Sequence, residues 1–208
     1  MASSRPIAVI ADVVRSRSYE DRDALQRQIE RALAEGAAAV PTREAFAATV
    51  GDEFQAVYDT LPGALAGTLH IQLGLPEGAA LRFGLGRGEV RPVASRTGRV
   101  QDGPGWWRAR EAIEALEAQE ASLPSAHSRF AGPDAEENAL VNAYLLARDQ
   151  LLAGLNVRAR RYARHALEGR SQADIAAELG VTQPAVSQAL RRPATRALLE
   201  GAALFTGE

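Results

Sequence analysis

The chain has 208 residues, of which 46% are hydrophobic and 24% are charged, with a formal net charge of −2 at pH 7. This composition is ordinary for a folded globular protein and excludes a disordered chain. There is no cysteine, which excludes disulfides and thiolate metal sites, and every strongly basic residue is arginine, which excludes lysine chemistry. No apolar stretch reaches the roughly 20 residues that span a bilayer. We therefore expect a cytoplasmic protein without membrane contact.

Hydrophobic periodicity predicts alternating strands and helices in the first half of the chain. The dipeptide Gly51-Asp52 between two of the strands is typical of a hairpin turn. The expected elements are a strand at 6–14, a helix from 18 to about 36, short strands on both sides of 51–52, a helix carrying Leu65, Leu69 and Leu73, a strand at 81–90 and a helix at 106–121. In the strand at 81–90, three glycines alternate on one face and leave room for backbone or ligand to approach: Gly84, Gly86 and Gly88.

This order of elements matches the split βαβ arrangement of ferredoxin-like folds, an antiparallel sheet with helices on one face. Residues 121–133 are rich in Ser, Pro and Gly, which is typical of a linker, and the chain from residue 134 onward is expected to be helical. We predict an α+β protein with a ferredoxin-like domain at 1–121, a linker at 122–135 and an all-α domain at 136–208.

Two aspartates are expected at one edge of this sheet. Asp12 ends the first strand, and Asp52 lies in the hairpin between the second and third strands. If these strands are neighbours, the carboxylates meet, and each raises the pKa of the other unless a cation neutralises them. Hard oxygen ligands of this kind bind Mg²⁺ or Mn²⁺, so we predict a metal site at Asp12 and Asp52. The plainer alternative is that Asp52 is only a turn residue.

The most specific motif occupies residues 168–192 and predicts a helix-turn-helix. Ser171 and Asp174 form the capping pattern of a first helix. Gly180 supplies the left-handed end of that helix, and Thr182 caps a second one. Gln and Arg side chains on the second helix can bond base edges, and Arg can also bond phosphate. The residues predicted to contact DNA are Ser171, Gln172, Thr182, Gln183, Ser187, Gln188, Arg191 and Arg192.

The charge distribution agrees with a polyanionic partner for this motif. After Asn156 the chain has eight arginines and five acidic residues, a balance of +3, so the preceding part carries −5. One recognition helix reads only a few bases, and we therefore expect a homodimer on DNA. The alternative is a helical hairpin that only packs or dimerises. Over residues 156–192 the segment also resembles the sigma-factor-like helix-turn-helix of bacterial regulators.

The segments around the two aspartates resemble class III nucleotidyl cyclases and the related GGDEF diguanylate cyclases. In those enzymes one metal carboxylate ends the first strand and another lies in the following hairpin, as Asp12 and Asp52 do here. Glu53-Phe54 completes a Gly-Asp-Glu-Phe string. The resemblance spans about residues 7–118, and it implies a nucleotide ligand held with Mg²⁺ or Mn²⁺.

Four positions depart from the cyclase pattern. In the enzymes they hold a transition-state Asn and Arg, a purine-reading Lys and the first Gly of the hairpin. Here they are, in that order, Trp107, Glu111, Ala48 and Val50. Arg108 or Arg110 is a candidate replacement for the lost Arg, but a transition-state clamp must be placed within fractions of an ångström. We therefore expect a degenerate or repurposed cyclase-like domain.

A closer resemblance is to the SatD family of bacterial proteins. Three segments carry it, 11–17, 51–55 and 102–111, and it extends through the helix-turn-helix. The arginines after the first strand suit phosphate, although they equally suit a solvated helix start. The residues predicted to bind a ligand or phosphate are Arg15, Arg17, Gly51, Glu53, Asp102, Arg108 and Arg110.

We expect a DNA-binding transcriptional regulator whose cyclase-like domain senses a ligand such as a nucleotide with a divalent metal, dimerises, or does both. One alternative is an active nucleotidyl cyclase or nucleotidyltransferase that uses the two-aspartate metal site. Another is a scaffold in which the cyclase-like domain serves only to dimerise.

Overall fold

A computed structural model describes residues 5–15, 19, 21–49, 51–93 and 100–206. Its strands and helices are, in chain order, β1 (Ile7–Val13), α1 (Arg22–Ala39), β2 (Glu44–Ala48), β3 (Glu53–Tyr58), α2 (Leu61–Gly74), β4 (Leu81–Arg87), β5 (Arg91–Val93), β6 (Val100–Asp102), α3 (Pro104–Gln119), β7 (Ser128–Ala131), α4 (Ala135–Ala153), α5 (Val157–Leu167), α6 (Gln172–Leu179), α7 (Gln183–Leu190) and α8 (Pro193–Thr206).

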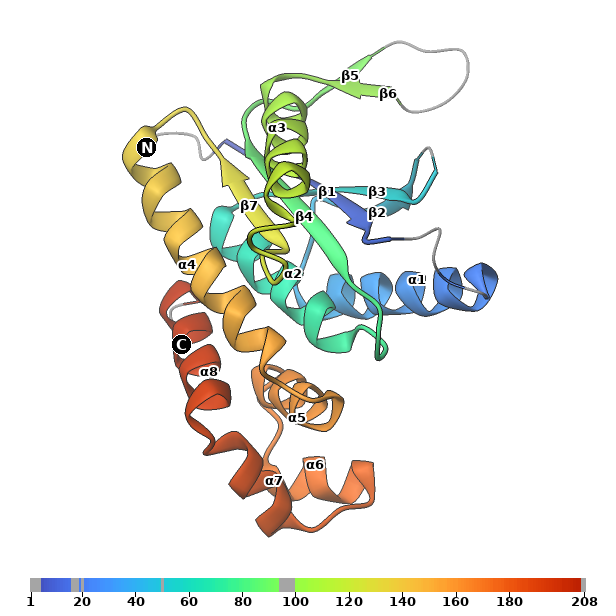
Figure 1. Ribbon diagram of the computed structural model, residues 1–208, viewed down its shortest axis with the longest axis vertical. Coiled ribbons are helices and arrows are strands. Elements are labelled where there is room, and N and C mark those ends of the chain that lie inside the picture. Colours follow the sequence, from blue (N-terminus) through green and yellow to red (C-terminus); the bar gives the residue numbers. More distant parts are fainter. Residues whose placement is uncertain (1–4, 16–18, 20, 50, 94–99, 207–208) are drawn as a thin grey trace.

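The main sheet has five strands in the order β2-β3-β1-β4-β7, with β1 at its centre (Figure 1). β1 pairs antiparallel with both β3 and β4, and β2 pairs antiparallel with β3. The order β2-β3-β1-β4, in which α1 and α2 connect the strands, is that of a ferredoxin-like fold. The predicted class, an α+β ferredoxin-like unit followed by helices, is therefore confirmed. β5 and β6 form a separate small hairpin.

β7 corrects part of the predicted linker at 122–135. Its four residues pair in parallel with β4, with Phe83 opposite Ser128 and Leu85 opposite Phe130. The Ser, Pro and Gly residues before and after β7 favoured a linker. A short edge strand carries little signal of its own, however, because much of its stability comes from packing against the neighbouring strand. The other domain limits stay a prediction.

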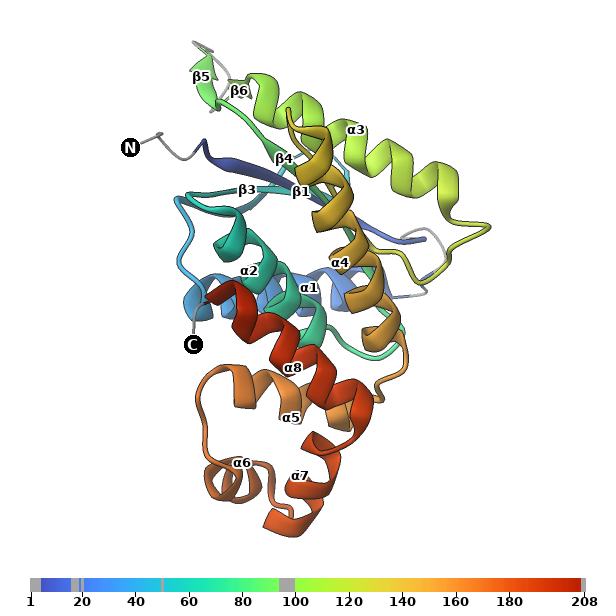
Figure 2. The same cartoon turned by 90° about the vertical axis from the view of Figure 1, so that its left-hand side faces the viewer.

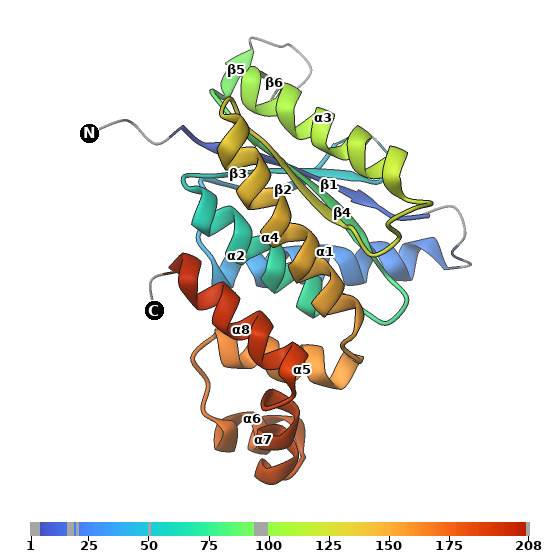
Figure 3. The ribbon, with the colours of Figure 1, turned by 60° about the vertical axis from the view of Figure 1, so that its left-hand side comes forward.

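Helices cover both faces of the sheet, whereas the sequence predicted helices on one face (Figure 3). α1, α2 and α4 share the larger core with Val9 and Ala11 of β1. α3 packs on the opposite face, against Ala8 and Ile10. Because side chains alternate along a strand, β1 contributes every second residue to each core. The central strand is therefore buried on both sides, and its side chains from Ile7 to Ala11 are at most 1% exposed.

Glycines in β4 allow α3 to contact the sheet backbone to backbone. A Cβ atom on Gly84 would collide with the carbonyl oxygen of Ala109, and one on Gly86 would collide with the carbonyl oxygen of Gly105. A larger residue at either position would therefore push the helix away. The space predicted from the alternating glycines is filled by a helix of the same chain.

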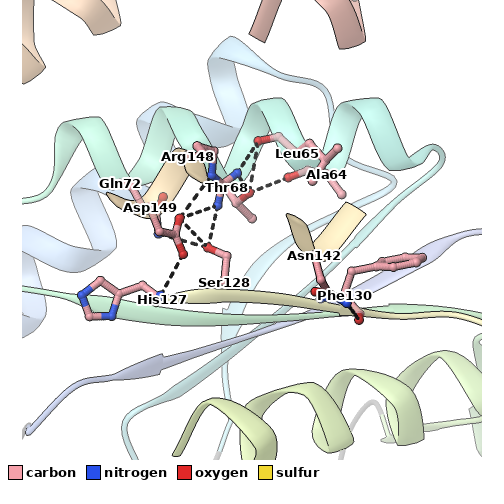
Figure 4. Close-up of polar contacts among 10 residues, drawn as sticks. All are labelled: Ala64, Leu65, Thr68, Gln72, His127, Ser128, Phe130, Asn142, Arg148 and Asp149. Atoms are coloured by element: carbon pink, nitrogen blue, oxygen red, sulfur yellow. Dashed lines mark hydrogen bonds and ion pairs between the residues drawn. The ribbon is translucent and has the colours of Figure 1, made fainter. Parts of the chain in front are cut away.

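A buried ion pair joins α4 to the sheet and to α2 (Figure 4). Arg148 and Asp149 are 1% and 2% exposed, and Arg148 Nη2 lies 3.2 Å from Asp149 Oδ1. Arg148 Nη2 also donates to Ser128 Oγ of β7, and Nη1 donates to the Leu65 carbonyl and to Thr68 Oγ1 of α2. These hydrogen bonds offset the cost of removing both charges from water.

α2 also holds the C-terminal helices in place. Leu69 and Leu73 form a second core with residues of α5 and α8. α6 and α7 lie beyond α5, at the end of the molecule away from the sheet (Figures 1 and 2). The helix-turn-helix region therefore packs on the sheet domain through α5 and α8. Among the described residues, no helix has the length and apolar character needed to cross a bilayer.

Replacing Gly86 by Ala tests the contact between β4 and α3. The added methyl group would collide with the backbone of Gly105 and Ala109, so we expect the free energy of unfolding to fall by about 3 kcal/mol. Gly154→Ala is the matched control, because Gly154 has φ −78° and a Cβ atom there would lie 3.4 Å from its nearest neighbour, the Leu151 carbonyl oxygen. Urea unfolding measures both variants. Equal stability of the two would contradict the contact.

Candidate functional site

β1 and β3 bring the two predicted metal carboxylates to the same edge of the sheet. The antiparallel register places Asp12 opposite Glu53, so the turn residue Asp52 lies next to the end of β1. The side chain of Asp12 lies on the α3 face, where it contacts Arg82 of β4. The strand order thus explains why these two carboxylates meet. Their role as metal ligands stays a prediction.

A buried arginine, which the sequence pattern did not single out, neutralises part of this edge. Arg82 is 8% exposed, and its Nη1 donates to Asp12 Oδ2 at 2.8 Å. Its Nη2 donates to Glu120, the residue that follows α3, at 2.5 Å, and Nη1 lies 3.3 Å from Glu117 of that helix. One signal was available in the sequence: a charged residue inside an apolar strand is nearly always paired.

The pKa of Asp12 is raised even though Arg82 donates a hydrogen bond to its carboxylate. Burial raises the pKa of Asp12 to about 6, from an ordinary value of 3.8. The Asp52 carboxylate is the next largest cause, and Glu117 adds to it, whereas Arg82 opposes the shift. The neighbouring carboxylates thus add to a shift whose main cause is burial.

The two carboxylates suit Mg²⁺ bound together with phosphate. In phosphate sites this ion takes one or two carboxylates and completes its shell with phosphate oxygens and water. Arg82 binds one oxygen of Asp12 and leaves the other, and Asp52 supplies a second carboxylate. In the described part of the chain, no group of three or more His, Asp or Glu side chains could hold a metal ion. The ion would therefore depend on the phosphates of a ligand.

Some of the predicted ligand residues gather beside this edge. Glu53 Oε2 accepts a hydrogen bond from Arg110 Nη2 of α3 at 2.5 Å. Gly51 has φ 75°, the left-handed conformation that its turn requires. Arg15 donates from Nε to Glu120 Oε1 at 3.1 Å. The arginines near the carboxylates are therefore held by acidic side chains, which a phosphate would have to displace or share.

Two more of the predicted ligand residues, Asp102 and Arg108, have structural partners. Arg108 Nη1 donates to the carbonyl of Arg87 at 2.7 Å, at the end of β4. Asp102 Oδ1 accepts from the indole N–H of Trp107 at 2.7 Å, which ties β6 to the start of α3. Arg17, like Val50, lies outside the described residues.

A groove of about 470 Å³ lies on the α3 face of the sheet. The two adjacent tryptophans differ in burial: Trp106 is 8% exposed and packs on the sheet, and Trp107 is 62% exposed. Trp107 and Arg110 line the groove, where they could contact a base and a phosphate. Glu111 lines it too, and its negative charge would repel a phosphate.

α6 and α7 form the helix-turn-helix predicted at residues 168–192, and α5 packs against them. Ser171 caps α6, and its Oγ accepts from the backbone N–H of Asp174 at 3.2 Å. Gly180 ends α6 with φ 64° and ψ 35°, the left-handed conformation that turns the chain. Ile175 of α6 and Val186 of α7 form a small core together with Tyr162 of α5.

The outward face of α7 is polar. Gln183 and Gln188 are exposed on it together with the small Pro184 and Ala185, and the exposed Arg191 and Arg192 follow the last residue of the helix. Neither arginine forms an ion pair within the part of the chain that the structure describes. Both guanidinium groups are therefore available to a partner.

The remaining residues predicted to contact DNA lie at helix starts or are partly buried. The hydroxyl group of Ser171 is engaged in capping α6 and also donates to Asp174 Oδ2 at 2.6 Å. Thr182 is the N-cap of α7 but makes no side-chain capping bond. Gln172 and Ser187 are half-buried. Helix starts commonly bind phosphate through their backbone N–H groups.

Solved structures with a similar fold are distant. Two structures of a bacterial light-regulated adenylyl cyclase are 14% identical to this chain, with TM-scores of 0.42 and 0.41, and the match covers 61% of this chain and 42% of theirs. A regulator of polyketide synthase expression from Bifidobacterium adolescentis is 15% identical, with a TM-score of 0.30, over 97% of this chain and 84% of that one. This chain thus spans less than half of the cyclase, and similarities of this size carry no argument about function.

No curated protein matches this sequence. The model of the SatD family matches residues 6–196. This match extends from the start of β1 into α8, and it therefore includes the carboxylate edge and the helix-turn-helix. The protein belongs to the SatD family.

Proposed function

We propose that this protein is a DNA-binding transcriptional regulator whose cyclase-like domain senses a nucleotide together with Mg²⁺ or Mn²⁺. The observation that carries the proposal is the exposed outer side of α7 and its C-cap. Gln188 and Arg191 lie there, and neither side chain takes part in a contact that holds the described structure together. Side chains of these types form bidentate bonds with adenine and guanine in the major groove. The Ser171 cap of α6, the left-handed turn at Gly180 and the small core with Val186 would hold α7 in the orientation that such readout needs.

The proposed regulator acts as a cytoplasmic homodimer. One α7 reads too few base pairs to select a site, and two copies related by a two-fold axis would bind a pseudo-palindromic sequence. Exposed apolar side chains outside the helix-turn-helix, among them Trp107 and Leu140, offer surface for such pairing. Sedimentation velocity with and without DNA measures the number of copies.

The double variant Gln188→Ala with Arg191→Ala tests the recognition helix. Each lost base contact removes about 1–3 kcal/mol of discrimination, so we expect specific affinity to fall towards the non-specific level with helicity unchanged. Gln28→Ala with Arg31→Ala is the matched control, because these exposed residues have the same types and spacing on α1. Fluorescence anisotropy with an operator selected from random DNA measures both. Equal affinities would show that α7 is not the reading helix.

The raised pKa of Asp12 predicts how metal-dependent nucleotide binding varies with pH. A metal ion requires the ionised carboxylate, and Asp12 has a pKa of about 6. Binding should therefore be nearly constant above neutral pH and weaken as the pH falls through 6, approaching about tenfold per unit below it. Calorimetric titration of Mn²⁺ with a non-hydrolysable ATP or GTP analogue measures this profile. Asp12→Asn should remove the pH dependence with most of the affinity, and an unchanged profile would exclude Asp12 as a ligand.

An active nucleotidyl cyclase or nucleotidyltransferase is the second candidate, and the two neighbouring carboxylates at the edge of the sheet favour it. Trp107 and Glu111 argue against this candidate. They line the groove, and they occupy the sequence positions at which the nucleotidyl cyclases have a transition-state Asn and Arg. Incubation with each nucleoside triphosphate and Mg²⁺ or Mn²⁺, followed by mass spectrometry, separates the candidates. A cyclic or transferred product that Asp52→Asn abolishes would replace the sensor proposal.

A further inference from the structure

α4 and α8 present one continuous outer face along the side of the molecule. The two helices run side by side in opposite directions (Figures 2 and 3). Tyr144 of α4 and Phe205 of α8 join them, with ring centroids 4.5 Å apart. A Cβ atom on Gly201, one turn before Phe205, would lie 3.6 Å from the same tyrosine ring. The outward sides of both helices therefore adjoin. We call the following exposed residues the α4–α8 face: Ala139, Leu140, Ala143, Leu146, Ala147 and Leu204.

This face is apolar although it is exposed. Among the described residues five large hydrophobic side chains are exposed, and three of them lie here: Leu140 at 66%, Leu146 at 43% and Leu204 at 86%. Between residues 138 and 153, all of which the structure describes, the only exposed polar side chain is that of Gln150. A contiguous apolar patch of this kind marks an interaction surface.

α4 is apolar on both of its sides. Its inner side contributes Val141, Leu145 and Leu152 to the two cores that it borders. Its outer side presents Leu140 and Leu146 to solvent. A helix that is hydrophobic around its whole circumference is normally buried. In the single chain the outer side of α4 is exposed, so its cover has to come from another molecule.

The shape of the face suits a second copy of the same chain. Ala139, Ala143 and Ala147 recur every four residues and form a shallow row along α4. Leu140 and Leu146 project on either side of this row. Rows at this spacing are the ridges and grooves through which helices interlock. Because each contact about a two-fold axis occurs twice, the leucines of one copy can pack over the alanines of the other.

The charge of the face also suits a second copy better than nucleic acid or an anionic membrane. A two-fold contact brings each side chain near its own counterpart, so a charged face would repel itself, whereas this face is neutral. One and two turns before Leu204, the exposed Glu200 and Arg196 lie 3.7 Å apart and offset each other. DNA and anionic lipids both require a surplus of basic side chains, which this arrangement does not offer.

The extent of the two helices approaches that of a standard dimer interface. α4 and α8 have 19 and 14 residues. With a rise of about 1.5 Å per residue and a diameter of about 10 Å, they cover roughly 20 by 25 Å side by side. The accessible area of a ridged helix surface exceeds its flat outline. The two helices therefore supply most of the about 800 Å² that each partner buries in a stable dimer.

We propose that two copies of this chain pair through the α4–α8 face about a two-fold axis. The face lies along the side of the molecule, and α6 and α7 lie at its end (Figure 3). A two-fold axis parallel to the long axis of the molecule places both helix-turn-helices at the same end, where one DNA duplex can reach them. The groove beside Trp107, on the opposite face of the sheet, stays open. The consequence for DNA rests on the proposed function, whereas the pairing does not.

The variant Ala143→Arg tests the face on the full chain. It places a charge in the middle of the alanine row, close to its counterpart in the second copy, so we expect the dissociation constant of the dimer to rise about a hundredfold or more. Folding should be unaffected, because Ala143 is exposed and Arg is a good helix former. Ala38→Arg, at an exposed alanine of α1, is the matched control and should leave the dimer unchanged.

Sedimentation velocity over a range of concentrations measures the dissociation constants of these proteins. We expect the unsubstituted chain to be dimeric at micromolar concentration. A chain that stays monomeric there, or a dimer that Ala143→Arg leaves intact, would overturn the proposal. Co-flotation of such a monomeric chain with phosphatidylcholine vesicles would show that the face binds lipid instead.

Cross-linking locates the contact independently of any effect on stability. The chain contains no cysteine, so Ala143→Cys introduces a single thiol, and Ala38→Cys provides the control. A short bismaleimide should join two copies of the Ala143→Cys protein and leave the Ala38→Cys protein uncoupled. Equal yields from the two variants would contradict a contact through this face.

DNA affinity separates this inference from the proposed function. A dimer that Ala143→Arg dissociates but that binds no DNA would support the face and contradict the regulator. Specific DNA binding by a dimer that Ala143→Arg leaves intact would support the regulator and contradict the face.

Discussion

Burial of α2 on two sides determines how the two halves of this protein are joined. One side, which includes Leu61 and Leu65, belongs to the core beneath the sheet, and the other, with Leu69 and Leu73, belongs to the core shared with α5 and α8. A helix that is apolar around most of its circumference cannot face water on any side. The C-terminal helices therefore pack on the sheet domain and do not hang from it on a linker. Because α5 also packs against α6 and α7, a shift of α5 relative to α2 would move the helix-turn-helix with it.

The opposite face of the sheet is constrained by backbone contact and by charge. The glycines in β4 allow α3 to pack very close to the sheet. Glu117 of α3 and Glu120 just after it can therefore accept hydrogen bonds from Arg82. Arg82 in turn binds Asp12, whose pKa nevertheless stays raised because the carboxyl group is buried beside Asp52. In the proposed sensor, a metal–nucleotide complex would share this edge with the guanidinium group of Arg82.

Several features could be predicted because their causes are local. The hairpin at Gly51 needs a left-handed residue, and Gly180 needs the same conformation to end α6, so both are visible as glycines beside polar turn residues. The helix-turn-helix was predictable because its caps, turn and small core lie within about 35 residues. Arg82 and β7 were missed for the opposite reason. The partners of Arg82 come from β1 and α3, and those of β7 come from β4, far away in the chain.

The sequence alone determined the α+β class, the order of strands and helices along most of the chain, and the helix-turn-helix with Gln188 and Arg191 at its outer side. These depend on periodicity, capping and turn chemistry, which act over a few residues. Only the tertiary structure decided that α3 covers the second face of the sheet, that Arg82 neutralises Asp12, and that the exposed apolar sides of α4 and α8 lie next to each other. Each of these depends on side chains from distant segments, whose distances are set by packing and by the pairing of buried charges.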